Sequence, residues 1–187
     1  WRPRCGECEA CLVGNPVLCR FGRVLATTNG LMDGTTRLHR DGERIHHLMG
    51  VSCFAEKVVV SETSVLRVPD GVPAEIAAIS ACAVITGVGA ALNAVSRAAG
   101  QPLAVLGAGG VGLAAVMGAA LTGAHPVIAI DLDPAKLELA QRLGATHVVD
   151  AGAGNVVEQV LELTGIGVPW LIEAVGLEDV TAPVGGL

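Results

Sequence analysis

The sequence has no tyrosine, and its aromatic rings are confined to two phenylalanines and two tryptophans. Surfaces that bind single-stranded nucleic acids stack successive bases on aromatic side chains, and this chain has few of them to offer. Its formal net charge of −6 would also repel a phosphate backbone. We therefore expect no nucleic-acid partner.

Charged residues are scarce as well, at 16% of the chain against 51% hydrophobic residues. This composition is typical of helices packed on a parallel sheet that is covered on both faces. One uncharged stretch, residues 103–121, is nineteen residues long and approaches the length of a membrane span. Five glycines interrupt it and Pro102 precedes it, so we expect no membrane partner.

The sequence shows no pattern of a secretory signal peptide, which favours a reduced, cytoplasmic protein. The chain starts on Trp1 and stops at Leu187, where an alternating pattern of helices and strands has not closed. We therefore expect it to be a fragment of a longer protein.

Four of the six cysteines crowd into the first nineteen residues, at Cys5, Cys8, Cys11 and Cys19. The two-residue gaps between the first three allow a tight turn to present their sulfur atoms to one point. Zinc in structural sites accepts four thiolates, with zinc–sulfur distances of about 2.3 Å. The spacing predicts a structural zinc site, and the alternative is a disulfide pair of the kind found in small secreted domains.

Residues 1–83 and 84–187 differ in character, and we predict a domain boundary between them. The first part contains turn-forming pairs such as Asp41-Gly42 and is expected to form loops with short strands. Strands are predicted over 53–61 and 65–68, where valine is frequent.

The second part alternates between strand and helix patterns. Strands are predicted over 103–106, 127–130, 147–149 and 170–172, and helices over 73–81, 86–99, 110–121, 134–143 and 156–163. Such alternation is typical of a doubly wound parallel (Rossmann) sheet. The predicted fold class is therefore α/β, with an incomplete Rossmann sheet that follows an irregular β region.

Residues 107–112, Gly-Ala-Gly-Gly-Val-Gly, lie where the first of these strands turns into a helix. In a dinucleotide fold Gly107 permits the tight turn, Gly109 lets the backbone approach a pyrophosphate, and Gly112 allows close helix packing. Gly110 opens the helix, whose free N–H groups favour phosphate. We predict that all four contact a nucleotide, and the alternative is a plain tight turn.

Asp131 ends the next strand, nineteen residues after Gly112. A carboxylate at this position can accept hydrogen bonds from the adenosine ribose, and it would repel a 2′-phosphate. The sequence therefore predicts NAD rather than NADP. The alternative is a solvated carboxylate at the end of a strand.

With these motifs in place, the chain resembles the medium-chain zinc-dependent alcohol dehydrogenases over essentially its whole length. The resemblance is carried by the four-cysteine loop, the glycine motif, Asp131, and the segments 82–89 (Cys-Ala-Val-Ile-Thr-Gly-Val-Gly) and 46–50. It implies that the first predicted domain is a partial GroES-like catalytic domain with a structural zinc lobe. The second would be a partial NAD-binding domain.

The resemblance also implies roles for four further residues. Cys82 would be a ligand of a catalytic zinc, Thr86 and Val111 would lie near the nicotinamide, and Lys136 would reach the adenosine ribose beside Asp131. From the sequence alone, Cys82 would instead be judged a small buried hydrophobic residue, the common fate of a free cysteine.

Three other side chains could suggest a site, but we assign none of them to one. Cys53 is expected to lie in the core. His46 and His47 are adjacent, and neighbouring residues of a strand point to opposite faces, so we expect them to be structural or part of a polar network.

The activity implied by the resemblance is the reversible, zinc-dependent oxidation of an alcohol to an aldehyde or ketone, with hydride transfer to NAD. A homo-oligomer is implied for the full-length protein. One cysteine cannot hold a catalytic zinc, so we expect these 187 residues to be inactive by themselves.

Other interpretations stay open. They are a thiol-adduct formaldehyde dehydrogenase of the same family, a non-catalytic zinc-stabilised nucleotide-binding module, and a relative of the quinone reductases, which the four-cysteine loop disfavours.

Overall fold

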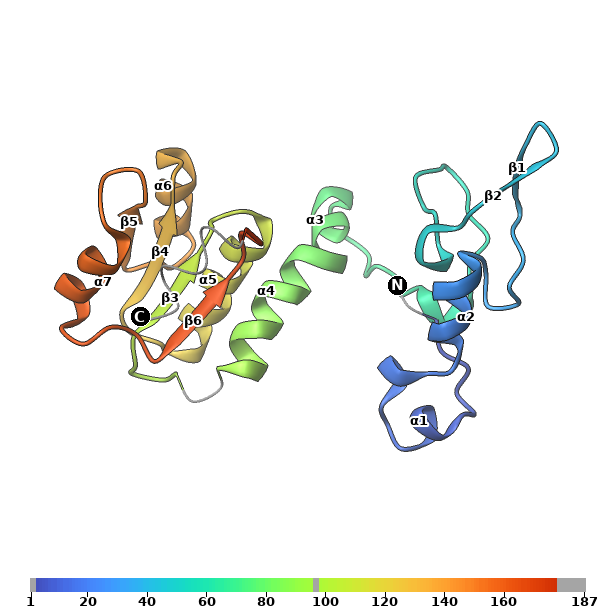
Figure 1. Ribbon diagram of the computed structural model, residues 1–187, viewed down its shortest axis with the longest axis horizontal. Helices are drawn as coiled ribbons and strands as arrows, with labels where there is room; N and C mark the ends of the chain where they lie inside the picture. Colours follow the sequence, from blue (N-terminus) through green and yellow to red (C-terminus); the bar gives the residue numbers. More distant parts are fainter. Residues whose placement is uncertain (1–2, 96–97, 178–187) are drawn as a thin grey trace. The chain divides into compact units, whose positions relative to one another are not determined.

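The computed structural model of this protein describes residues 3–95 and 98–177 (Figure 1). The chain divides into two compact units, Trp1–Val72 and Pro73–Leu187. Each unit has its own secondary structure, and each carries one of the two sites expected from the sequence.

The boundary between the two units, at residues 72 and 73, precedes the domain boundary that the sequence predicted at residues 83 and 84. The helical run Ala74–Ala94 passes through that position without a break. Because the run packs against the helix Gly110–Thr122 of the second unit, it belongs to that unit as a whole.

The first unit consists of short elements joined by loops. They are α1 (Glu9–Leu12), η1 (Pro16–Leu18), α2 (Phe21–Thr28), β1 (Leu38–Arg40), β2 (Glu43–Ile45), η2 (Leu48–Gly50) and η3 (Glu62–Ser64). The strands β1 and β2 pair antiparallel across the turn Asp41-Gly42. Both turn residues have positive φ, 52° and 81°, the conformation that a tight hairpin with right-handed strand twist requires.

The strands predicted over 53–61 and 65–68 are wrong, because these residues are extended or bent without forming a strand, and only η3 lies between them. Valine-rich segments suit a pleated surface, but a strand forms only where a second strand accepts its hydrogen bonds. Among the described residues of this unit, none pairs with either segment.

The second unit is built on a parallel sheet with the strand order β5-β4-β3-β6. Its strands are β3 (Leu103–Leu106), β4 (Val127–Asp131), β5 (His147–Asp150) and β6 (Trp170–Glu173), and its connecting helices are α5 (Gly110–Thr122), α6 (Pro134–Arg142) and α7 (Val156–Thr164). The chain runs outward from β3 to β5 and then returns to the other side of β3. That reversal is the switch point of a doubly wound sheet.

Both faces of this sheet are covered, which confirms the predicted fold class. On one face Leu103 and Val105 pack against Ala115 and Val116 of α5. On the other face, Leu106 and its neighbours pack around Val160 of α7, which is fully buried. The strands β3 and β4 therefore lie in the middle of the core, as their unbroken apolar sequences require.

The helix α6 shows how local sequence fixes an element's start. The Asp133 carboxylate accepts a hydrogen bond of 2.9 Å from the Ala135 N–H, and Pro134 occupies the first helical position. Gly144 follows the helix with φ +119°, a conformation that residues with a Cβ atom rarely adopt. These features place Asp131 and Lys136 on either side of a well-defined helix start.

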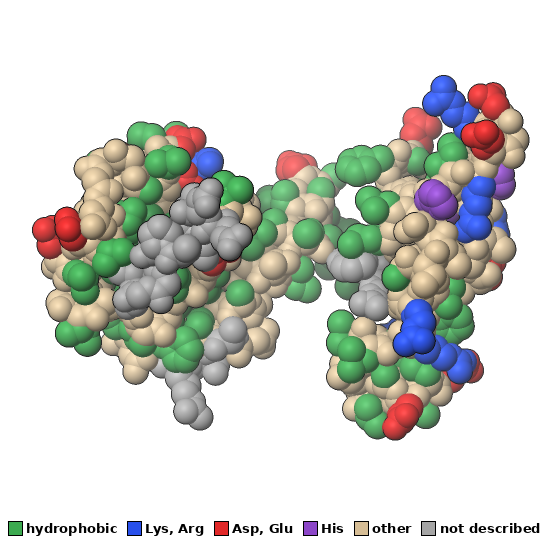
Figure 2. Space-filling model, viewed as in Figure 1, with side chains coloured by type: hydrophobic (Ala, Val, Ile, Leu, Met, Phe, Trp, Pro, Cys, Tyr) green, Lys and Arg blue, Asp and Glu red, His purple; other side chains and the backbone are tan. Residues whose placement is uncertain are grey.

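The helical run of the second unit comprises α3 (Ala74–Ile79), η4 (Ser80–Val84), α4 (Ile85–Gly89) and η5 (Ala90–Ala94), and both η segments are π-helical. By length and composition alone, its portion Ala74–Asn93, with a mean hydropathy of 1.8, could cross a bilayer. Some of its hydrophobic side chains are on the surface (Figure 2), and Ile76, Ile79, Ile85 and Leu92 are exposed. Its opposite side is packed against α5, where Gly87 and Ala91 are buried.

Gly87 marks the closest approach of α4 to α5. A Cβ atom at Gly87 would lie 2.2 Å from the Val111 carbonyl oxygen, whereas one at Gly89 would meet only the Asn93 side chain, at 3.6 Å. The small residue at position 87 therefore sets the distance between the two helices.

We predict that Gly87→Ala destabilises the chain by about 1–3 kcal/mol, because the added methyl group forces the helices apart. Gly89→Ala is the matched control and is expected to be neutral or to stabilise by about 0.5–1 kcal/mol, since alanine loses less backbone entropy in a helix. Urea unfolding followed by circular dichroism measures both changes. Equal stability of the two variants would contradict the packing argument.

Candidate functional site

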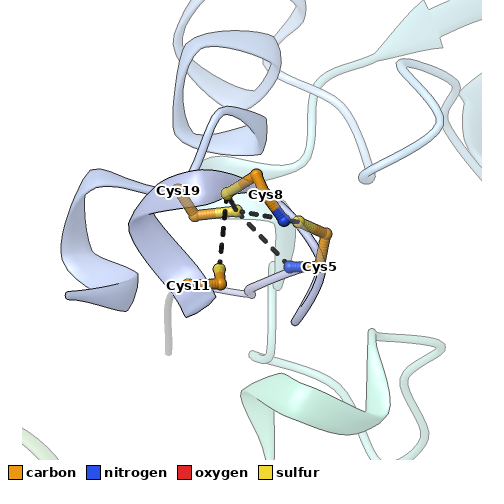
Figure 3. A group of neighbouring side chains, drawn as sticks. All are labelled: Cys5, Cys8, Cys11 and Cys19. Carbon is orange, nitrogen blue, oxygen red and sulfur yellow. Dashed lines mark hydrogen bonds between the residues drawn. The ribbon is translucent and has the colours of Figure 1, made fainter. Parts of the chain in front are cut away.

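The four cysteines of the first unit converge on one point (Figure 3). The Sγ atom of Cys8 lies 3.5 Å from that of Cys11 and 3.9 Å from that of Cys19, and the Cys19 and Cys5 Sγ atoms are 3.7 Å apart. Four sulfurs around a zinc ion at about 2.3 Å would be spaced by about 3.8 Å in a regular tetrahedron. The predicted ligand set therefore has the size that zinc requires.

The backbone around the cysteines holds this arrangement. The N–H of Cys8 donates to the Cys5 Sγ at 3.3 Å, and the N–H of Cys5 donates to the Cys19 Sγ at 3.4 Å. Gly6 lies between them with φ +78°, which lets the loop fold back on itself. Hydrogen bonds of this kind stabilise thiolates over thiols.

The thiols of the cluster differ in acidity. Hydrogen bonds from the Arg20 and Cys11 backbone lower the pKa of the Cys8 thiol to about 6. Burial raises the pKa of the Cys11 thiol to about 11. Burial raises the pKa of the Cys19 thiol, but hydrogen bonds from the Cys5 and Phe21 backbone outweigh it, so that its pKa also lies below the ordinary value. Because zinc binding displaces the protons that remain, the affinity of the cluster for zinc increases with pH.

The other two cysteines lie on the surface. Cys53 and Cys82 are both exposed. The expectation that Cys53 lies in the core is therefore wrong. The sequence alone would also have placed Cys82 in the interior, and that expectation is wrong as well. Cys82 lies in the π-helical segment η4. Within residues 3–95 and 98–177, the four-cysteine cluster is the only group of three or more Cys, His, Asp or Glu side chains close enough to hold a metal ion.

The second site lies at the carboxyl ends of β3 and β4, beside the switch point of the sheet. Gly107 follows β3 with φ +91°. A Cβ atom at Gly112 would lie 1.7 Å from the Gly107 carbonyl oxygen, whereas one at Gly109 would meet no protein atom within 4 Å. Gly107 and Gly112 are thus required by the turn itself, and Gly109 leaves its backbone open to a ligand.

The Asp131 carboxylate closes one side of this turn. Its Oδ2 accepts a hydrogen bond of 2.7 Å from the Ala108 N–H, and its Oδ1 accepts one of 3.0 Å from the Asp133 N–H. Lys136 Nζ lies 3.5 Å from Oδ1. Burial raises the pKa of Asp131, but these hydrogen bonds and the Lys136 charge outweigh it, so that its pKa lies below the ordinary value.

A crevice of about 340 Å³ opens at this position. Gly107, Asp131 and Lys136 line it, together with Val175 and Leu177 from the segment after β6. The structure thus brings three of the predicted cofactor contacts into one cavity. Val175 and Leu177 were not predicted from the sequence. The pairing of β3 with β6 could have indicated them, because residues that follow neighbouring parallel strands meet at the same edge of the sheet.

Further predicted contacts lie on α5 and α4, which pack against each other at Gly87. Gly110 and Val111 form the first turn of α5. Thr86 is exposed on α4, next to the Gly87 position that touches the Val111 backbone. Cys82 lies one turn before Thr86 on the same helical run.

The four-cysteine lobe and the doubly wound sheet together define the class of zinc-binding dehydrogenases. Residues 110–183 match the sequence profile of the family described as zinc-binding dehydrogenase. The chain is thus similar to zinc-binding dehydrogenases in both of its units.

Individual relatives agree with this placement. The chain is 41% identical to the alcohol dehydrogenase class-3 of Myxine glutinosa, in a match that covers 93% of this chain and 47% of that protein. A zinc-binding domain protein of alcohol dehydrogenase type from Burkholderia ambifaria matches with a TM-score of 0.85 and 36% identity, over 98% of this chain and 50% of that one. The benzyl alcohol dehydrogenase of Acinetobacter calcoaceticus matches with a TM-score of 0.78 and 31% identity, over 98% and 49% of the two chains. The chain spans about half the length of the curated relatives it matches.

We predict that the chain binds one zinc ion at the cluster and that Cys8→Ser lowers the zinc affinity by at least about 100-fold, since even groups that only orient metal ligands contribute about 10–100-fold. Cys53→Ser removes a thiol outside the cluster and is expected to leave the affinity unchanged. Competition with a chromogenic chelator measures both values. Zinc binding that survives Cys8→Ser unchanged would contradict the four-thiolate site.

Proposed function

We propose that the protein to which this chain belongs is an NAD-linked, zinc-dependent alcohol dehydrogenase that interconverts an alcohol and its aldehyde or ketone. The observation that carries the proposal is the presence, in one chain, of a thiolate cluster of zinc dimensions and a glycine-turn crevice closed by Asp131. A catalytic zinc and NAD would supply the Lewis acid and the hydride acceptor of this chemistry.

The cysteines of this chain would have two separate roles. Cys5, Cys8, Cys11 and Cys19 would hold a structural zinc ion and stiffen the lobe. Cys82, exposed on its π-helical turn, would offer one thiolate to the catalytic metal. Because Cys82 belongs to no group of three or more ligand side chains among the described residues, we propose that this chain alone does not catalyse the reaction.

The crevice would bind and orient the coenzyme. The open backbone at Gly109 and the helix start at Gly110 would face the pyrophosphate. The ionised Asp131 and the neighbouring Lys136 would hold the adenosine ribose, and the negative charge of Asp131 would disfavour a 2′-phosphate. Thr86 and Val111, on the two helices in contact, would flank the nicotinamide.

Two further properties belong to this proposal. We propose a reduced, cytoplasmic location, which the six free thiols support. We also propose that the full-length protein is a homo-oligomer, on the basis of the family resemblance. We propose that its substrate is a small alcohol or aldehyde and that it has no nucleic-acid or membrane partner.

A glycine variant tests the coenzyme site without disturbing the fold. Because a Cβ atom at Gly109 meets no protein atom, Gly109→Ala is expected to keep wild-type stability. It should weaken NADH binding about tenfold or more, since the methyl group blocks charge-assisted hydrogen bonds to phosphate, each worth about 1.5–3 kcal/mol. NADH fluorescence titration measures the affinity, with Gly89→Ala as the control. Unchanged binding in Gly109→Ala would exclude the pyrophosphate assignment.

Metal content and activity of the whole protein test the chemistry. We expect two zinc ions per subunit and oxidation of simple alcohols with NAD in preference to NADP. Cys82→Ser should remove one zinc ion and the activity while the structural zinc stays, and Cys53→Ser should change neither. A substrate panel with and without thiol adducts separates an alcohol dehydrogenase from a thiol-adduct formaldehyde dehydrogenase. One zinc ion and no turnover would instead indicate a non-catalytic nucleotide-binding module.

A further inference from the structure

A carboxylate at the end of β6 folds the segment that follows the strand into a turn. The Oε1 atom of Glu173 accepts hydrogen bonds of 2.5 Å from the Val175 N–H and 2.7 Å from the Gly176 N–H. Gly176 has φ +75°, a backbone conformation that favours glycine. One carboxylate oxygen therefore takes two backbone N–H groups beyond the end of the strand, and a charged acceptor makes such bonds stronger than neutral ones.

This turn lies directly on the glycine turn that follows β3. The Ala174 N–H donates to the Leu106 carbonyl oxygen at 2.9 Å, so the segment stays paired with β3 up to this residue. A Cβ atom at Gly107 would lie 2.7 Å from Val175 Cγ2 and 3.2 Å from the Ala174 carbonyl oxygen. The Val175 side chain is thereby held against the Gly107 backbone.

The segment after β6 gives the coenzyme crevice an apolar side. Val175 and Leu177 line the crevice together with Asp131. Val175 is 38% exposed and Leu177 is 59% exposed, so neither side chain is fixed by burial in the core. Glu173 itself does not line the crevice. Its hydrogen bonds instead set the direction in which the segment that carries both side chains runs.

We propose that Glu173 is a positioning residue for the coenzyme, whose carboxylate preforms the apolar side of the crevice by fixing the backbone of Val175 and Gly176. The inference rests on the proposed coenzyme site, in which Asp131 holds the adenosine ribose, so the side chains that Glu173 positions face the adenosine half of the ligand. A site that is ordered before the ligand arrives binds more tightly, because less conformational entropy is lost on binding.

Titration of the zinc-loaded protein with AMP and with NADH tests the proposal, since AMP carries only the adenosine half of the coenzyme. Calorimetry measures the first affinity and fluorescence the second. Glu173→Ala is expected to weaken both ligands by the same factor, about tenfold, because each must then order the segment after β6 itself. A general loosening of the second unit would instead weaken NADH more than AMP, since NADH would also contact the helix start at Gly110.

Two matched variants serve as controls. The side-chain amide oxygen of Glu173→Gln can accept the same two hydrogen bonds, so this variant is expected to bind AMP more tightly than Glu173→Ala does and close to the wild-type affinity. Glu162→Ala removes the same charge from an exposed position on α7, outside the crevice. It should leave both affinities unchanged.

Amide hydrogen exchange without any ligand gives a readout that does not depend on the coenzyme. The Val175 and Gly176 N–H groups belong to exposed residues. They are nevertheless expected to exchange at least about tenfold more slowly in the wild type than in Glu173→Ala, because a hydrogen-bonded amide exchanges only when its bond opens.

Equal weakening of AMP and NADH in Glu173→Ala, with recovery in Glu173→Gln, supports the positioning role. Unchanged binding in Glu173→Ala, a loss that Glu173→Gln does not recover, or a larger loss for NADH than for AMP would overturn it. Unprotected Val175 and Gly176 amides in the wild type would overturn it as well. A wild-type protein that binds neither ligand would remove the proposed coenzyme site, and this inference with it.

Discussion

The turn between β3 and α5 has no room for a side chain, and the coenzyme crevice depends on this constraint. A Cβ atom at Gly112 would lie 1.7 Å from the Gly107 carbonyl oxygen, so the first turn of α5 can sit directly on the end of β3. This close approach turns the Ala108 N–H toward Asp131, which accepts it at 2.7 Å. The glycines thus shape the loop and also hold the carboxylate at the rim of the crevice.

The two sites differ in how far the sequence could predict them. The cysteine cluster is local, because all four ligands lie between Cys5 and Cys19, and their spacing alone indicated the geometry that the sulfur distances confirm. The crevice is assembled from the ends of four strands, so the sequence predicted Gly107 and Asp131 but not Val175 and Leu177. Those residues join the site through strand order, which is a property of the whole sheet.

The secondary structure follows the same rule. Elements that depend on local sequence were predicted, and elements that depend on a distant partner were not. Every strand and helix of the sheet after residue 100 formed close to its predicted bounds, because each carries its own caps and apolar period. The segments 53–61 and 65–68 have strand composition but depend on a partner strand.

The proposed preference for NAD follows from how Asp131 is already engaged. An ionised carboxylate has about four acceptor positions, and hydrogen bonds from Ala108 and Asp133 and the Lys136 contact use three of them. One position is left for a ribose hydroxyl. The same contacts lower the pKa of Asp131, so the group stays charged throughout the physiological range. Rejection of a 2′-phosphate would then be a fixed property of the site that no change of physiological pH relaxes.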